Sequence, residues 1–298
     1  MVVKIGTSGS ETLTGTSSAD RLEGRGGNDR LNGLGGNDIL KGEAGNDTLN
    51  GGAGSDRLDG GLNTDTALYG SAGSGVTVDL HITGAQNTGG SGTDTLVGIE
   101  NLTGSNFNDD LRGNDGSNVL SGSGGNDTVI GFGGNDSIGG GPGDDTLDGF
   151  TGSDRILGGS GNDFLLGFDD GDVLKGELGN DTLVGESGGD DLYGGLGVDK
   201  LDGGTNDDSF FFETASSGDF NAGQADTILD FEDGVDRIFL QGSYDFAGNT
   251  NRPSDGQYGI WQNASGDFVV TWNAVSDGSF HDVIVQGGGD PTDDVSFF

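Results

Sequence analysis

The sequence feature that most constrains the fold is a period of nine residues. The stretch from Gly122 to Phe211 divides without a gap into ten units of nine residues. In each unit the first residue is Gly, the fourth is usually Gly, the sixth is Asp, and the eighth is Leu, Ile, Val or Phe. A short fixed period indicates a repeat architecture, in which units stack and each contacts only its neighbours.

The nine positions divide into a strand and a turn. Positions seven to nine place one apolar residue between two others, which predicts a three-residue strand with one inward side chain. Positions one to six are rich in Gly and end in Asn-Asp or a similar pair, which is typical of turns. Two units then close one coil of eighteen residues, and coils stack at the usual strand spacing of about 4.8 Å. The sequence therefore predicts an all-β fold, a parallel β-roll with two sheets and turns along both edges.

The Asp at the sixth position recurs at every turn. Stacking should place each one beside the Asp eighteen residues away, for example Asp127 beside Asp145. Rows of like charge at that spacing repel one another unless a cation lies between them. The chain has no Cys and two His, so the available ligands are carboxylate and carbonyl oxygens. Hard oxygen ligands favour Ca²⁺ over zinc or copper, and Mg²⁺ is disfavoured because it requires a tight octahedron.

We therefore predict that several Ca²⁺ ions are held by the sixth-position Asp side chains and by main-chain carbonyls of Gly. The predicted ligands are Asp29, Asp38, Asp47, Asp56, Asp65, Asp109, Asp127, Asp136, Asp145, Asp154, Asp163, Asp172, Asp181, Asp190, Asp199 and Asp208, with Gly33, Gly42, Gly51, Gly122, Gly131, Gly140, Gly149, Gly158 and Gly176. Asn118 stands where Asp is expected, which should weaken its site by one charge.

Two units match a known signature at every fixed position. They are Gly158-Gly-Ser-Gly-Asn-Asp-Phe-Leu-Leu and Gly51-Gly-Ala-Gly-Ser-Asp-Arg-Leu-Asp. They resemble the Gly-Gly-x-Gly-x-Asp-x-U-x repeat of the RTX family, the haemolysin-type calcium-binding proteins. The resemblance implies a right-handed parallel β-roll with Ca²⁺ bound between neighbouring turns. It also implies export by a type I secretion system.

The repeats divide the chain into four segments. Residues 1–67 form a first β-roll block, 68–103 an inserted strand and loop segment that continues the roll, and 104–211 a second block. The first two units lack much of the turn pattern, as Glu11 shows, and should act as a cap, because terminal repeats are commonly atypical.

Residues 212–298 are predicted to form a C-terminal β cap, because 15 of the 22 aromatic residues lie between Phe210 and Phe298. Six strand-like runs are expected towards the C-terminus, at 209–213, 227–231, 237–240, 258–262, 268–272 and 282–285, and Ala264-Ser-Gly266 suits a hairpin turn. Residues 226–240 resemble the segment that follows the roll in serralysin-type secreted proteases. The last six residues, 293–298, are similar to C-terminal signals of type I secretion. We therefore expect this segment to hold the secretion signal as well as the cap.

Composition limits the classes of function. The chain has 66 Gly among 298 residues, 30% hydrophobic residues and a formal net charge of −38. Such a chain should be largely disordered without calcium, because it buries too little apolar surface to offset chain entropy and self-repulsion. The acidity argues against nucleic acid as a partner, and no segment approaches the apolar length of a membrane span. The first residues show no apolar stretch of signal-peptide type, and without Cys, calcium must supply the cross-links.

Three hypotheses for function remain. The favoured one is a secreted, extracellular calcium-binding protein, free or associated with the cell surface, with a structural or interaction role and no enzymatic activity. The second is a surface-layer or matrix protein that self-assembles with calcium. The third is an enzyme, or a module that binds or modifies polysaccharide, in which Tyr258, Trp261 and Trp272 stack on sugar rings. Candidate partners are therefore Ca²⁺, the secretion machinery during export, further copies of the chain and cell-surface polysaccharide.

Two patterns that could signal catalysis have simpler explanations. His81 has no surrounding catalytic constellation in the sequence and is interpreted as a surface histidine. Gly185-Glu-Ser-Gly-Gly189 matches the pattern of a hydrolase nucleophile, but it falls in register with the nonapeptides. No strand-to-helix elbow is expected there, so we interpret Ser187 as a turn residue.

Overall fold

The computed structural model describes residues 1–212, 225–232, 235–240, 245–246, 257–262, 268–273, 280–287, 291 and 294–297. These residues form β-strands and turns and contain no α-helix, so none of them belongs to a helix able to span a membrane. The chain divides into two compact units, Met1–Gly149 and Phe150–Phe298. Strand β17 (Thr146–Thr151) lies at the boundary between them.

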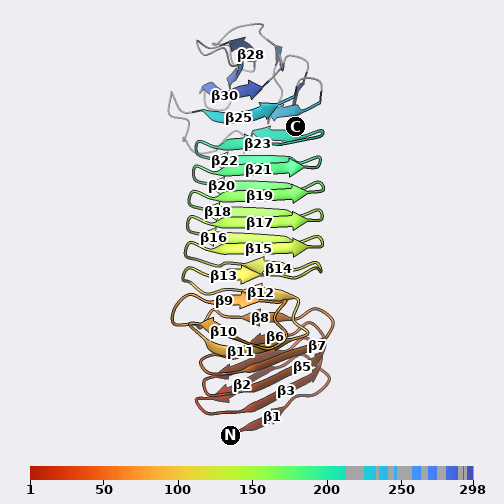
Figure 1. Cartoon of the computed structure of the whole chain (residues 1–298), viewed down its shortest axis with the longest axis vertical. Coiled ribbons are helices and arrows are strands. Elements are labelled where there is room, and N and C mark those ends of the chain that lie inside the picture. The colour runs from red at the N-terminus through yellow and green to blue at the C-terminus, as the bar shows by residue number, and fades with distance from the viewer. Residues whose placement is uncertain are drawn as a thin grey trace. The chain divides into compact units, whose positions relative to one another are not determined.

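The first unit is a stack of short strands joined by turns (Figure 1). Its strands are β1 (Val3–Ile5), β2 (Thr12–Thr16), β3 (Arg21–Gly26), β4 (Arg30–Leu34), β5 (Ile39–Ala44), β6 (Thr48–Asn50), β7 (Arg57–Leu62), β8 (Thr66–Leu68), β9 (Thr77–Asp79), β10 (Ala85–Gly89), β11 (Gly92–Val97), β12 (Asn101–Thr103), β13 (Asp110–Arg112), β14 (Val119–Ser121), β15 (Thr128–Gly133) and β16 (Ser137–Pro142). They pair in the orders β1-β3-β5-β7-β11-β10, β2-β4-β6-β8-β12-β14-β16 and β9-β13-β15. All these pairs are parallel except the β10–β11 hairpin.

The second unit repeats this construction, and Figure 1 shows β18 to β23 as successive rungs of one stack. Its strands are β18 (Arg155–Ser160), β19 (Phe164–Asp169), β20 (Val173–Leu178), β21 (Thr182–Ser187), β22 (Asp191–Leu196), β23 (Lys200–Asp202), β24 (Ser209–Phe212), β25 (Asp226–Phe231), β26 (Arg237–Leu240), β27 (Asp245–Phe246), β28 (Gln257–Gln262), β29 (Phe268–Asn273), β30 (Phe280–Gly287) and β31 (Val295–Phe297). One sheet runs β18-β20-β22-β24-β26-β31 and the other β19-β21-β23-β25-β30-β29-β28-β27. The predicted parallel β-roll is confirmed.

The core of the roll is a column of apolar residues at the eighth position. In register, Leu22 lies opposite Leu40, and Leu40 opposite Leu58. These three side chains are at most 1% exposed. Leu165 lies opposite Leu183 in the second unit in the same way. Each partner is eighteen residues away, so the predicted coil length is confirmed. Burying one such side chain contributes about 1.5–3 kcal/mol.

The predicted three-residue strand is too short for many units. Strand β20, for example, has six residues, and both Leu174 and Gly176 in it are buried. Beyond Lys175 the main chain stays in register with the next coil, since Glu177 pairs with Gly195. The strand therefore runs from position seven of one unit to position three of the next. The inward residue in its second half is a Gly, which adds no side chain to the apolar column.

Residues 68–103 change the spacing between paired strands. The main-chain N–H of Asp56 reaches Asp94, 38 residues away, instead of a residue eighteen away. The main-chain N–H of Asp65 donates to Glu100, 35 residues away, and that of Val76 donates to Asp109, 33 residues away. Strands β11 and β12 nevertheless pair parallel with β7 and β8. Strands β11 and β12 therefore extend the sheets of the first block, whereas β9 pairs with β13 of the second block.

The six strands predicted towards the C-terminus are present as β24, β25, β26, β28, β29 and β30. Strands β28, β29 and β30 pair antiparallel, unlike the strands of the roll. Val270 and Val283 are fully buried there, as expected for an apolar core. The predicted hairpin turn at Ala264-Ser-Gly266 lies outside the described residues.

Candidate calcium-binding turns

The sixth-position Asp residues form buried rows. Each predicted Asp ligand is at most 4% exposed. The main-chain N–H of Asp127 donates to Oδ1 of Asp145 at 2.8 Å, and Asp172 donates to Asp190 at the same distance. The predicted neighbourhood of Asp127 and Asp145 is confirmed. One oxygen of each carboxylate in such a pair is thus held by the preceding coil, which fixes the side chain in place.

The second carboxylate oxygen has no protein partner in many turns. In those turns Oδ2 is buried and accepts no hydrogen bond, and we call them open turns. A buried carboxylate oxygen without a partner is costly unless a cation or a donor satisfies it. Open turns are found at Asp29, Asp38, Asp47, Asp56, Asp65, Asp127, Asp172, Asp181, Asp190, Asp199 and Asp208.

A main-chain carbonyl oxygen lies close to Oδ2 in the open turns. An ideal Cβ built on Gly33 would meet Oδ2 of Asp38 and, at 2.5 Å, the carbonyl oxygen of Gly51 in the next coil. Gly at the first position therefore leaves room between a carboxylate and a carbonyl. Both are the hard oxygen ligands that Ca²⁺ accepts, so the turns fit the ion. Among the described residues, no three acidic, His or Cys side chains form a group that could hold a metal ion.

The predicted Gly ligands lie at this first position. Carbonyl oxygens of seven of them face the Gly one coil earlier in this way: Gly33, Gly42, Gly51, Gly122, Gly131, Gly149 and Gly176. Gly140 and Gly158 occupy the same position of their units, in β16 and β18.

Burial changes the acidity of the open turns. It raises the pKa of Asp127 to about 7 and that of Asp172 to about 8, because the charged form loses its hydration. The pKa of Asp181 and that of Asp199 rise to about 7 for the same reason. These carboxylates are poorly stabilised as anions by the protein alone. A bound cation would supply the missing stabilisation.

Open turns also have a characteristic backbone. Residues at the second position adopt left-handed conformations even when they are not Gly, as Leu34 (φ 77°) and Glu43 (φ 76°) show. The fourth position is usually left-handed too, for example Gly36 with φ 105°. Nothing in the sequence marks this conformation at the second position, because its side chains vary from Arg to Phe.

Within the two repeat blocks four turns differ from this pattern, and we call them closed turns. Here the second-position N–H donates to the sixth-position side chain: Thr7 to Glu11, Thr16 to Asp20, Ser105 to Asp109 and Asn114 to Asn118, at 2.5–3.0 Å. Beyond the second block, the N–H of Glu232 makes the same contact with Asp236 at 2.8 Å. Asp109 was predicted as a ligand together with the open-turn residues. Its Oδ1 also accepts the N–H of Val76 at 2.7 Å and the Ser105 hydroxyl at 2.8 Å.

Sequence reasoning missed four members of the rows. Asp94 and Glu100 accept the N–H groups of Asp56 and Asp65. Asp226 and Asp236 accept those of Asp199 and Asp208 at 2.9 and 3.1 Å. The three Asp residues could have been found from the pattern Asp-x-apolar, as in Asp94-Thr-Leu and Asp226-Thr-Ile. Glu100 carries no such signal.

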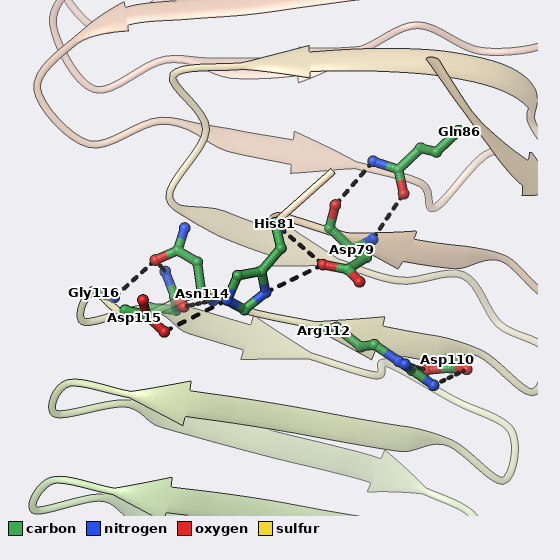
Figure 2. Close-up of polar contacts among 9 residues, drawn as sticks. Asp79, His81, Gln86, Asp110, Arg112, Asn114, Asp115 and Gly116 are labelled. Atoms are coloured by element: carbon green, nitrogen blue, oxygen red, sulfur yellow. Dashed lines mark hydrogen bonds and ion pairs between the residues drawn. The ribbon is translucent and has the colours of Figure 1, made fainter. Parts of the chain in front are cut away.

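His81 makes structural contacts, which Figure 2 shows. Its Nδ1 lies 3.3 Å from Asp79 and its Nε2 lies 3.5 Å from Asp115, which is 94% exposed. Its ring packs edge-on against Phe132, with centroids 4.8 Å apart. Gln86 holds the same turn by pairing with the main chain of Asp79. The contacts join the turn after β9 to the turn after β13.

The remaining candidates for catalysis or sugar binding are placed as follows. Ser187 ends strand β21, and its hydroxyl donates to Asp169 at 2.9 Å and to the carbonyl of Phe168. Tyr258 is 7% exposed, which fits core packing better than a sugar-stacking surface. The side chains of Trp261 and Trp272 lie outside the described residues.

Comparison with protein families supports this description. The family model for the RTX calcium-binding nonapeptide repeat matches residues 5–40, 33–67, 103–138, 130–165, 166–201 and 175–210, together more than half of the chain. A search of curated proteins finds no match. Among solved structures, the crystal structure of the extracellular lipase LipA from Serratia marcescens matches with 16% identity and a TM-score of 0.24. The match covers 99% of this chain and 39% of the lipase.

Proposed function

Because the chain belongs to the RTX calcium-binding nonapeptide repeat family, we propose that calcium binding switches it from an unfolded to a folded state after export. The observation that carries the proposal is the set of buried Asp oxygens without protein partners in the open turns, such as Oδ2 of Asp38 and of Asp181. Without a cation these groups oppose folding, and with one they stabilise the fold. Binding and folding are then a single event.

The switch suits passage through a type I secretion channel. Where free calcium is scarce, the net charge of −38 and the low apolar content keep the chain extended. Outside the cell, sites with dissociation constants of roughly 10⁻⁴ to 10⁻³ M fill. Neighbouring coils share a row, so one filled turn orders the next, as in other one-dimensional repeat stacks.

The folded protein then has a structural or interaction role outside the cell, without catalytic activity. Support comes from His81 and Ser187, whose described contacts are those of turn and strand residues. Hydrolytic turnover by the pure protein, abolished by substitution of one of these residues, would contradict this part of the proposal.

The experiment that tests the switch is a Ca²⁺ titration of protein stripped with EDTA. Far-UV circular dichroism and light scattering are measured on the same sample. A sharp transition from coil to β-structure at constant mass is the expected result. A transition accompanied by growth in mass would favour the self-assembling alternative. A chain already folded in EDTA at neutral pH would contradict the proposal.

A further inference from the structure

The closed turns satisfy their own polar groups. In the turn at Asp20, Oδ2 accepts the N–H and the hydroxyl of Thr16, both at 2.7 Å, and Oδ1 accepts the N–H of Val2. In the turn at Asn118, Oδ1 accepts the N–H of Asn114 at 2.8 Å, and Nδ2 donates to the carbonyl of Glu100 at 2.6 Å. Calcium would have to displace these hydrogen bonds. The N–H groups also direct positive partial charge towards the place where a cation would lie.

The backbone of the closed turns differs as well. Their second residues, Thr7, Thr16, Ser105 and Asn114, are absent from the left-handed region that the open turns use at this position. Each instead accepts the N–H of the residue two positions later on its side-chain oxygen, at 2.8–3.3 Å. This local bond is the Asx or Ser/Thr turn, which replaces the left-handed bend.

Ser123 shows that the conformation decides, and not the residue type alone. It is a Ser at the second position, but it adopts φ 83° and therefore follows the open pattern. Oδ2 of Asp127 in its turn is buried without a partner. Two features occur together in all four closed turns. The sixth-position side chain accepts the N–H of the second residue, and that second residue lies outside the left-handed region.

We propose that the turns at Glu11, Asp20, Asp109 and Asn118 form without calcium and do not take up the ion, whereas calcium fills the open turns. The closed turns are the first two of each block. Each block thus begins with a metal-independent edge. Asp94 resembles the closed-turn residues, because its Oδ2 accepts a hydrogen bond from the hydroxyl of Thr88 at 2.9 Å. The inference rests on the proposed function, since it takes the open turns to bind calcium.

The test compares Asp109→Asn with Asp127→Asn. The two residues are neighbours in one row, since the N–H of Asp109 donates to Oδ1 of Asp127 at 2.8 Å. The number of Ca²⁺ ions bound at saturation is measured by equilibrium dialysis, and circular dichroism verifies the fold. We expect Asp127→Asn to bind fewer ions than the unsubstituted chain and Asp109→Asn to bind the same number. An equal loss in both variants would overturn the inference while leaving the calcium switch intact.

A second variant keeps the test decisive if Asp109→Asn does not fold. Asn118→Asp adds a carboxylate to a closed turn with almost no change in shape. We expect no additional bound ion, because the N–H of Asn114 already donates to the side-chain oxygen at position 118. One additional ion at saturation would overturn the inference. An unsubstituted chain that binds no calcium would instead remove the proposed function and the inference together.

Discussion

At the scale of single residues, adjacent glycines in one turn have different tasks. Gly36 adopts φ 105°, and a Cβ there would lie 2.5 Å from the main-chain N of Ala19. Gly35 has ordinary φ, and its nearest neighbour would be the Ala53 carbonyl oxygen at 3.6 Å. Only Gly36 is therefore required by conformation and space. The fourth position of an open turn needs Gly, or a residue such as Asn or Asp that tolerates the left-handed region.

The pair Gly36→Ala and Gly35→Ala tests this difference. Forcing Ala into the left-handed region costs about 1–3 kcal/mol, and the contact with Ala19 adds to that. Gly35→Ala should change the free energy of unfolding by no more than about 0.5 kcal/mol. Both are measured by guanidinium unfolding in saturating calcium. Equal losses would show that the two positions are not distinguished by backbone conformation.

At the scale of one element, a strand of the roll presents a single apolar side chain to the core. In β20, Leu174 is fully buried, whereas Leu178 in the same strand is 50% exposed. A strand such as β20 therefore contributes one large apolar contact, which is little for an element that must stay ordered. The rest of its stability must come from parallel pairing and from the turns at its ends.

Leu174→Ala should lower the free energy of unfolding by about 2–5 kcal/mol, because it leaves a cavity in the column. Leu178→Ala, in the same strand, should change it by no more than about 0.5 kcal/mol. Calcium-saturated protein is unfolded with denaturant to compare them. If Leu178→Ala is as damaging as Leu174→Ala, the third position carries a packing role that its exposure does not indicate.

At the scale of the whole molecule, protons and calcium should substitute for one another. Burial raises the pKa of the open-turn Asp residues, to about 6 for Asp65 and Asp190 and to about 8 for Asp172, from an ordinary 3.8. A carboxyl group whose folded pKa is raised favours the fold most below its unfolded pKa. That contribution is lost as the pH rises through the folded value.

In EDTA the chain should therefore gain β-structure near pH 4 and lose it between about pH 4 and 8. With calcium the β-structure should persist at pH 8. Far-UV circular dichroism against pH measures both, and light scattering controls for association near the isoelectric point of about 4.1. A calcium-free chain that folds better at pH 8 than at pH 5 would contradict the assignment of raised pKa values to the open turns.

The period of nine predicts the parts that repeat, and it does not predict their exceptions. Coil length, the Leu column and the Asp rows follow from spacing alone, because every coil imposes the same geometry. The second position was missed because Leu34 and Glu43 carry no sign of a left-handed backbone. Asp109 looks like its neighbours in sequence. Its turn is distinguished by Ser105, which lies outside the left-handed region and donates its N–H to Asp109. Glu100 joins a row through a loop of irregular length, which a periodic pattern cannot specify.

The unequal spacings across residues 68–103 have a consequence for how the chain finds its fold. Coils of identical length permit a slip by one whole coil, in which every strand still meets an equivalent partner. Such misaligned stacks would be close in energy to the correct one and slow to correct. The separations of 38, 35 and 33 residues occur once, and together they are compatible with one alignment. Residues 68–103 therefore fix the register of the stacked coils, which the identical repeats alone do not determine.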